Sequence, residues 1–263
     1  MLVQTLVRIK NRIGADVFAR EEIAGWALEH VERCGHSPAR VLDVGLGAAD
    51  DLLSLRRAGG RVPVELYGVE CYAPRIASAR ARGIEVFAID VERQPIPLPD
   101  ASLDVLMANH VIEHLKELFF FFSEVSRVLR PGGLCIIGCP NLGGWHNRLA
   151  LLFGEEPPCM RVLGSHVRGI TIPGFRRFIA HGGFFEVRRV KGRAFYMAPG
   201  ALSQGLASAF PGLGAGVHFV MARTAKPGTF IEVLDMGIPG IEDTPYYRGP
   251  PAMALVDDGA VLR

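Results

Sequence analysis

The stretch of this chain that most constrains its fold is Val41-Leu42-Asp43-Val44-Gly45-Leu46-Gly47-Ala48-Ala49-Asp50. Its first four residues have the apolar character of a buried strand, and three leucines at helical spacing follow the stretch. Between the strand and the helix, Gly45 and Gly47 allow positive φ angles and let a ligand lie against bare main chain. The first amides of the helix can meet a polar ligand group. This order of elements is typical of nucleotide-type binding sites in α/β domains.

The spacing of the glycines narrows the kind of ligand. A dinucleotide fingerprint, G-x-G-x-x-G, needs a third glycine where Asp50 stands, and a carboxylate there would repel a pyrophosphate. Asp43, two residues before the first glycine, instead suits a ligand that carries a positive group and no phosphate. Taken alone, two glycines are equally consistent with a plain structural turn.

Further strands alternate with helices after this turn. Strands are predicted at 64–69, 85–89, 103–108 and 134–139, and helices at 76–82 and 115–129. The pattern predicts a doubly wound α/β fold with a mostly parallel sheet. Ligands of such sheets bind outside the carboxyl ends of the strands. We therefore expect the polar residues that close these strands to lie around one site.

Two acids close neighbouring strands. Glu70 can accept hydrogen bonds from two ribose hydroxyls, and Asp90 can accept one from an exocyclic amine such as that of adenine. Each acid alone could be a solvated loop residue. Both together with the glycine turn predict a nucleoside site.

Six stretches give the chain a family resemblance. They are Val41-Leu42-Asp43-Val44-Gly45-Leu46-Gly47, Tyr67-Gly68-Val69-Glu70, Ala88-Ile89-Asp90-Val91, Leu98-Pro99-Asp100-Ala101-Ser102-Leu103-Asp104-Val105, Asn109-His110-Val111-Ile112-Glu113-His114-Leu115 and Arg127-Val128-Leu129-Arg130-Pro131-Gly132-Gly133. As a set they resemble the class I S-adenosylmethionine-dependent methyltransferases, over about residues 39–225. The resemblance implies a seven-stranded Rossmann-like sheet with an antiparallel last strand. It also implies an enzyme that uses S-adenosylmethionine.

The resemblance also assigns cofactor-binding residues: Asp43, Gly45, Leu46, Gly47, Glu70, Cys71, Asp90, Val91, Asn109 and His110. The glycine turn and the acid before it would line the methionine end of the cofactor. The two strand-end acids would hold the ribose and the adenine. One departure is Ala49, which stands where the family often has a third glycine.

Methyl transfer of this kind is a direct in-line displacement, which needs a general base only for some acceptors. His114 is the candidate base, with His110 beside it. Both would share a helix face near the methyl group if the helix after residue 109 begins early enough. The alternative is that His114 only orients the start of that helix. His146 and His166 are weaker candidates.

Three segments frame the domain organisation. Residues 1–38 are expected to form a helical cap, and 39–225 the methyltransferase domain. Within that domain, strands near 184–190 and 217–222 would complete the sheet, and 141–170 would be a substrate cover. Residues 226–263 contain five prolines and are expected to form an irregular tail.

The cover segment should choose the acceptor. Arg148 or Arg168 could bind an acidic group of the substrate, although pairing with Glu155 or Glu156 is the favoured interpretation. This region also resembles relatives associated with glycan pathways. We therefore expect a small-molecule or sugar-like acceptor. A cofactor-binding or scaffold protein without turnover is the alternative, and an oxidoreductase is disfavoured by Asp50.

Composition excludes several other classes. The net charge of +2 without a long basic block argues against a nucleic-acid partner. An N/D-P-P-Y motif, which DNA amino-methylation would require, does not follow the fourth strand. The five cysteines are scattered without a C-x-x-C pair, so we expect no metal site and a reduced, cytoplasmic setting. No apolar run is long enough to span a membrane or to act as a leader. The sequence does not predict the oligomeric state.

Overall fold

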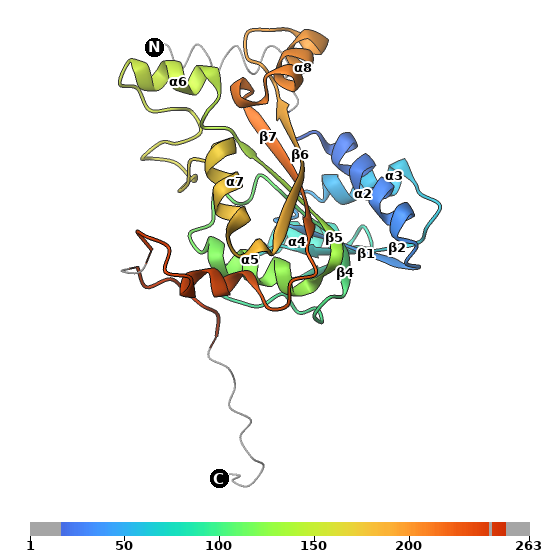
Figure 1. Cartoon of the computed structure of the whole chain (residues 1–263). Coiled ribbons are helices and arrows are strands. Elements are labelled where there is room, and N and C mark those ends of the chain that lie inside the picture. The colour runs from blue at the N-terminus through green and yellow to red at the C-terminus, as the bar shows by residue number, and fades with distance from the viewer. Residues whose placement is uncertain (1–16, 242–243, 251–263) are drawn as a thin grey trace.

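A seven-stranded sheet organises the part of the chain that the computed structural model describes, residues 17–241 and 244–250 (Figure 1). Its strands are β1 (Ala39–Val44), β2 (Val64–Val69), β3 (Glu85–Phe87), β4 (Leu103–Asn109), β5 (Leu129–Pro140), β6 (Phe185–Arg193) and β7 (Gly216–Arg223). The strand order is β3-β2-β1-β4-β5-β7-β6. Strands β1 to β5 pair in parallel, and β7 is antiparallel to both β5 and β6. The predicted fold class is therefore confirmed.

Helices cover both faces of the sheet (Figure 1). One core forms where α2 (Arg20–Cys34), α3 (Asp50–Ala58) and α4 (Ala73–Arg80) pack on the sheet. The opposite core contains α5 (Leu118–Val128) and α7 (Ile172–Ala180), with many phenylalanines. Because both faces are covered, the central strand β1 is apolar almost throughout, and its pattern shows no alternation. Its polar residues are the half-buried Arg40 near its start and the buried Asp43 near its end.

The glycine turn after β1 needs glycine for two reasons. Gly45 has a φ of 70°, and a Cβ atom on it would lie 2.5 Å from Cγ2 of Val111. Gly47 has a φ of 55°. The departure at Ala49 has a conformational consequence, because Ala49 also adopts a left-handed φ of 63° just before α3. Glycine would adopt that conformation without strain.

The helix expected at 115–129 begins later, at Leu118, and ends at Val128. Residues 111–117 form turns instead. The reason lies in Glu92, whose Oε1 accepts hydrogen bonds from the backbone amides of Lys116 and Glu117. These amides are thus satisfied outside any helix. The third strand is also shorter than expected and ends at Phe87.

The sequence patterns do not predict α6 (Trp145–Leu152), α8 (Gly200–Ala209) or the 3₁₀ helix η3 (Phe230–Asp235). The helix α6 lies in the predicted cover, and η3 packs against α5 (Figure 1). Two shorter 3₁₀ turns, η1 (His181–Gly183) and η2 (Pro211–Leu213), precede β6 and β7.

Residues 1–16 of the predicted cap and residues 242–243 and 251–263 of the predicted tail fall outside the described residues. Within 17–38, α2 packs across α3, and within the described part of the tail η3 buries Phe230 completely. Among the described helices, none is both long and apolar enough to cross a bilayer.

Candidate active site

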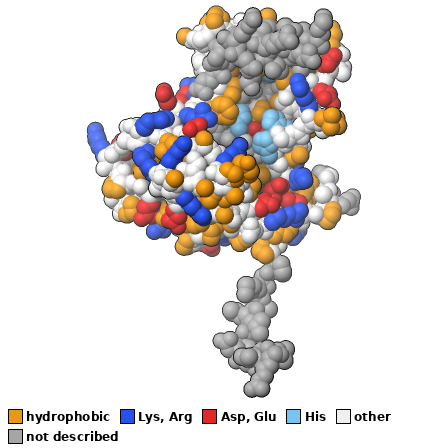
Figure 2. Space-filling view, turned by 180° about the vertical axis from the view of Figure 1, so that it is seen from behind, with side chains coloured by type: hydrophobic (Ala, Val, Ile, Leu, Met, Phe, Trp, Pro, Cys, Tyr) orange, Lys and Arg blue, Asp and Glu red, His pale blue; other side chains and the backbone are white. Residues whose placement is uncertain are grey.

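A cleft of about 280 Å³ opens where β1 and β4 end, at the carboxyl edge of the parallel strands. The expected site residues that line it are Gly45, Leu46, Gly47, Asn109, His110 and His114. Leu46 contributes mainly main chain, since its side chain packs in the core beneath α2 and α3. Figure 2 shows histidine side chains grouped near the middle of one face of the molecule. The cleft therefore collects most of the predicted residues in one place.

Glu70 lies directly behind the glycine turn. Its carboxylate is buried and accepts hydrogen bonds from the backbone amides of Gly47, Cys71 and Tyr72, each at 3.0 Å. Nη1 of Arg75 lies 3.7 Å from Oε2. A carboxylate offers about four acceptor positions. Glu70 is thus held rigidly by the main chain and keeps acceptor capacity for a ligand hydroxyl.

Asp43 and Asp51 place two more carboxyl groups at the same turn. Asp43 is 2% exposed, and burial raises its pKa well above the usual range, helped by the charges of Asp51 and Glu70. Burial also raises the pKa of Asp51, while a hydrogen bond from Asn109 and the charge of Arg20 oppose this rise. Asp51 lines the cleft, and Asp43, Asp51 and Glu70 lie close enough for their charges to interact.

Asn109 braces the cleft. Its Nδ2 donates to the backbone oxygen of Phe18 at 3.0 Å and to Oδ2 of Asp51 at 3.1 Å. Its Oδ1 lies 3.3 Å from Nε2 of His218, and burial lowers the pKa of His218 to about 3, so this histidine is neutral. Asn109 thereby joins the segment before α2, the start of α3 and strand β7. Its role beside a cofactor stays a prediction.

His110 and His114 line the same cleft for a reason other than the expected one. They do not share a helix face, because the backbone amide of His114 bonds to Val111 in a tight turn ahead of α5. The Nδ1 atom of His110 lies 3.1 Å from Oε1 of Glu113, and its buried Nε2 has no hydrogen-bond partner within the described chain. The Nδ1 atom of His114 lies 3.0 Å from the backbone oxygen of Ser165. Because that oxygen can only accept, Nε2 of His114 is the basic nitrogen.

The residues expected at the adenine end lie beyond the cleft. Asp90 is exposed and accepts a hydrogen bond from the amide of Glu92 at 2.9 Å, which orders a turn after β3. Val91 is half-buried against the α5-side core, and Cys71 is exposed beside Glu70. Burial raises the pKa of the Cys71 thiol, with the charge of Glu70 adding to the effect.

The arginines of the cover bind main chain, so the favoured pairing with Glu155 or Glu156 is wrong. Nε of Arg148 donates to the backbone oxygen of Gly143 at 2.6 Å. Arg168 donates to the backbone oxygens of Leu115 and Lys116. Each arginine thus fixes a loop of the cover.

A groove of about 360 Å³ continues from the cover toward α7. Its lining includes Met160, Val167, Ile170 and Phe175. The amide of Val167 donates to the backbone oxygen of Glu113 at 2.8 Å, which ties the groove to the turn that carries His114. An apolar groove of this kind suits a small apolar molecule.

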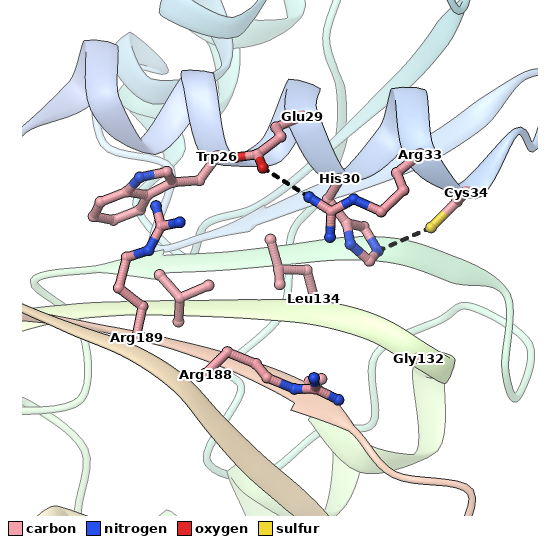
Figure 3. Close-up of a pocket in the computed structure, with 11 residues that line it drawn as sticks. Trp26, Glu29, His30, Arg33, Cys34, Gly132, Leu134, Arg188 and Arg189 are labelled. Atoms are coloured by element: carbon pink, nitrogen blue, oxygen red, sulfur yellow. Dashed lines mark hydrogen bonds and ion pairs between the residues drawn. The ribbon is translucent and has the colours of Figure 1, made fainter.

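A larger cavity of about 430 Å³ lies elsewhere, between α2 and strands β5, β6 and β7 (Figure 3). Trp26, His30 and Arg33 come from the helix, and Arg188 and Arg189 come from β6. The cavity reaches the amino end of β5, at Gly132, and not the carboxyl edge of the sheet. The acids and glycines of the predicted site do not line it.

Sequence reasoning missed several contributors to the cleft, chiefly Phe18, Arg20 and Asp51. Arg20 pairs with Asp50 at 3.2 Å and approaches Asp51 at 3.6 Å. Asp50 and Asp51 are adjacent at the start of α3, and both line the cleft. No sequence signal marks Phe18 or Arg20, because their position depends on how α2 docks.

Comparison with known proteins also points to a methyltransferase domain. The family model of the methyltransferase domain matches residues 42–137. A probable S-adenosylmethionine-dependent methyltransferase of Mycolicibacterium smegmatis is 35% identical over 47% of this chain and 45% of its own length. Demethylmenaquinone methyltransferase of Thermus thermophilus is 31% identical over 47% of this chain and 54% of its own. The chain spans about half the length of these curated relatives.

A solved structure from Thermotoga maritima, an S-adenosylmethionine-dependent methyltransferase described as a possible histamine N-methyltransferase, has a TM-score of 0.52. It is 20% identical and covers 85% of this chain and 99% of its own, which shows the shared fold. The strand order, the glycine turn with its acids and these matches agree. Residues 42–137 therefore match the methyltransferase-domain family, and the sheet has the fold of S-adenosylmethionine-dependent methyltransferases.

Proposed function

We propose that this protein transfers a methyl group from S-adenosylmethionine to a small-molecule acceptor. The observation that carries the proposal is the group of three carboxyl residues, Asp43, Asp51 and Glu70, around a glycine turn at the carboxyl edge of the sheet. S-adenosylmethionine would supply a methyl group on a positively charged sulfur, and its methionine part also carries a charged amino group. Acidic side chains on bare main chain suit these two cationic groups.

The geometry supports a binding role for each of these residues. The main chain at Gly45 and Gly47 would lie against the methionine part, with Asp43 beneath it. Glu70 would accept hydrogen bonds from the ribose, since backbone amides already hold its carboxylate in position. Asp90 and Val91 would border the adenine at the open end. Holding two reactants in line is the main catalytic contribution available, worth roughly 7–11 kcal/mol.

The acceptor would enter from the groove under the cover. Its apolar lining and its link to the turn of His114 support an apolar molecule with a reactive group at one end. The Thermus relative is named for demethylmenaquinone, a small molecule, which supports the same acceptor class. A sugar-like acceptor is the other candidate, and it would need polar contacts from the cover.

His114 is the candidate to hold the acceptor's proton. Its Nδ1 is engaged by the backbone oxygen of Ser165, so Nε2 is available at the cleft. His110 is the second candidate, because its Nε2 is buried without a partner within the described residues.

Turnover can be tested with S-adenosylmethionine and a panel of quinols, catechols and sugar nucleotides, by mass spectrometry of S-adenosylhomocysteine and of methylated acceptor. The proposal expects both products in equal amounts with at least one class. Cofactor binding without either product across hydroxyl, amine and carbon acceptors would favour the alternative of a cofactor-binding scaffold.

A further inference from the structure

Three side chains meet at the rim of the cleft: Glu113, His114 and His166. One potential ligand atom from each lies within 4.8 Å of the other two. Glu113 and His114 come from the turn after β4, and His166 comes from the cover. Hydrogen bonds from the amides of Val167 and Arg168 to the backbone oxygen of Glu113 hold the two segments together.

Both histidines are oriented by backbone oxygens. Nδ1 of His114 lies 3.0 Å from the oxygen of Ser165, and Nδ1 of His166 lies 2.9 Å from the oxygen of Cys159. A carbonyl oxygen accepts hydrogen bonds and cannot donate them, so each Nδ1 carries the proton and each Nε2 keeps a free lone pair. Metal-binding histidines are usually fixed in this way, by an acceptor on the nitrogen that does not bind the metal.

The third member, Glu113, has an unsatisfied oxygen. Its side chain is 1% exposed, and Oε1 lies 3.1 Å from Nδ1 of His110. The buried Oε2 has no hydrogen-bond partner within the described residues. A buried carboxylate oxygen without a partner is unfavourable unless a cation or donor satisfies it.

We propose that Glu113, His114 and His166 bind one divalent first-row transition-metal ion such as Zn²⁺ or Co²⁺. Two imidazole nitrogens and one carboxylate oxygen suit these ions better than Mg²⁺ or Ca²⁺, which prefer oxygen ligands. Tetrahedral coordination at usual bond lengths would bring the ligand atoms to about 3.3 Å apart. Small side-chain rotations of exposed His114 and half-buried His166 can close that gap.

The position of the site suits an ion that binds and activates the acceptor. His114 lines the cofactor cleft, and Val167, next to His166, lines the acceptor groove. Three protein ligands leave a coordination position open, where an oxygen of the acceptor would bind and lose its proton to solvent more readily. This task rests on the proposed methyl transfer, whereas metal binding does not. In the metal-loaded protein, Nε2 of His114 is a ligand and not a base.

Metal binding can be tested on the full chain after chelator treatment, by calorimetric titration with Zn²⁺ and by visible spectroscopy with Co²⁺. The test variants are Glu113→Gln and His166→Ala. His181→Ala, at an exposed histidine in η1, is the matched control. We expect one ion per chain, affinity at least 100-fold weaker in both test variants, no change in the control and no thiolate charge-transfer band with Co²⁺.

Two results would overturn the proposal: no binding to the unmodified chain, or equal affinity in the chain and in His166→Ala. Binding of S-adenosylhomocysteine, measured on the same samples, reports folding of the variants and separates the two proposals. Metal binding without cofactor binding would leave the metal site standing and remove methyl transfer. Cofactor binding without metal binding would remove the metal site and leave the proposed methyl transfer standing.

Discussion

Glu70 shows how much one side chain contributes to the candidate site. Three backbone amides hold its buried carboxylate, and one of them belongs to the glycine turn of the neighbouring strand. The residue therefore joins two strand ends while it faces the proposed ribose position. A side chain fixed in this way loses little freedom when a ligand binds.

Replacement of Glu70 by alanine should weaken binding of S-adenosylhomocysteine by about 1.5–3 kcal/mol, the scale of hydrogen bonds to a charged group. Calorimetric titration measures this directly. Glu65→Ala is the control on the same strand, because Glu65 bonds to Arg40 and Tyr67 away from the cleft. Equal affinity in Glu70→Ala and the unmodified chain would remove Glu70 from the cofactor site.

At this scale the sequence predicted residues whose role follows from chain position alone. Asp43, Gly45 and Glu70 end or follow parallel strands, and parallel strands end at one edge. The predicted helix face shared by His110 and His114 is wrong. Glu92 accepts hydrogen bonds from two backbone amides ahead of α5, and the helix begins only after them. Asp51 and Glu113 were missed, since their burial depends on packing that no spacing reveals. The expectation of no metal rested on cysteine spacing, which does not bear on a group of histidines and a glutamate.

Among the elements, η3 connects the chain after β7 to the core. A capping box between Thr229 and Glu232 begins it, and the amide of Phe230 donates to Oγ of Ser126 in α5 at 2.9 Å. The ring of Phe230 is fully buried beside Phe122 and other rings of the α5-side core. A short helix this well anchored behaves as part of the domain.

Phe230→Ala should lower the free energy of unfolding by about 3–5 kcal/mol, because it leaves a cavity among aromatic rings. Urea denaturation followed by circular dichroism gives the value. Phe210→Ala is the matched control, since this ring is 56% exposed and its loss should change stability by less than about 0.5 kcal/mol. A change below about 1 kcal/mol in Phe230→Ala would contradict the anchoring role.

Elements in the centre of the sheet could be predicted, and peripheral ones could not. Buried parallel strands are continuous apolar runs between turns, and they recur in the order that the fold requires. The helix α6 begins with tryptophan, histidine and asparagine, and α8 contains two glycines and two serines, which have lower helix propensity than alanine or leucine.

For the whole molecule, we expect the acids around the glycine turn to couple proton binding to cofactor binding and to stability. Burial and neighbouring charges raise the pKa of Asp43 above the value of about 3.9 for a free aspartate. The folded state therefore holds this proton more tightly than the unfolded state. This contribution to stability is present at low pH, and it falls as the pH rises from about 3.9 through the raised pKa. A cationic ligand favours the charged form of Asp43, and it therefore opposes this loss of stability as the pH rises.

The stabilisation that S-adenosylmethionine gives should therefore grow as the pH rises through this window. Melting temperatures with and without the cofactor, measured across the pH range, test this coupling. In Asp43→Asn the pH dependence should flatten, the ligand-free protein should gain about 0.5–2 kcal/mol at neutral pH, and cofactor affinity should fall. The same pH dependence in Asp43→Asn and the unmodified chain would show that another group is responsible.

Topology was predictable because few arrangements of alternating strands and helices are allowed, and the resemblance selected one of them. The acceptor was not predictable in this way. We propose that it depends on the predicted cover at 141–170 and on the groove beside α7, which are built from tertiary contacts such as those of Arg148 and Arg168.

The central claim is that the cleft at the end of β1 and β4 binds S-adenosylmethionine. Calorimetric titration of the full chain with S-adenosylhomocysteine, with NAD in a parallel experiment, tests it most directly. We expect binding of one S-adenosylhomocysteine per chain with micromolar affinity and no binding of NAD. Absence of S-adenosylhomocysteine binding, or binding of NAD in its place, would show that the cleft is not a site for S-adenosylmethionine.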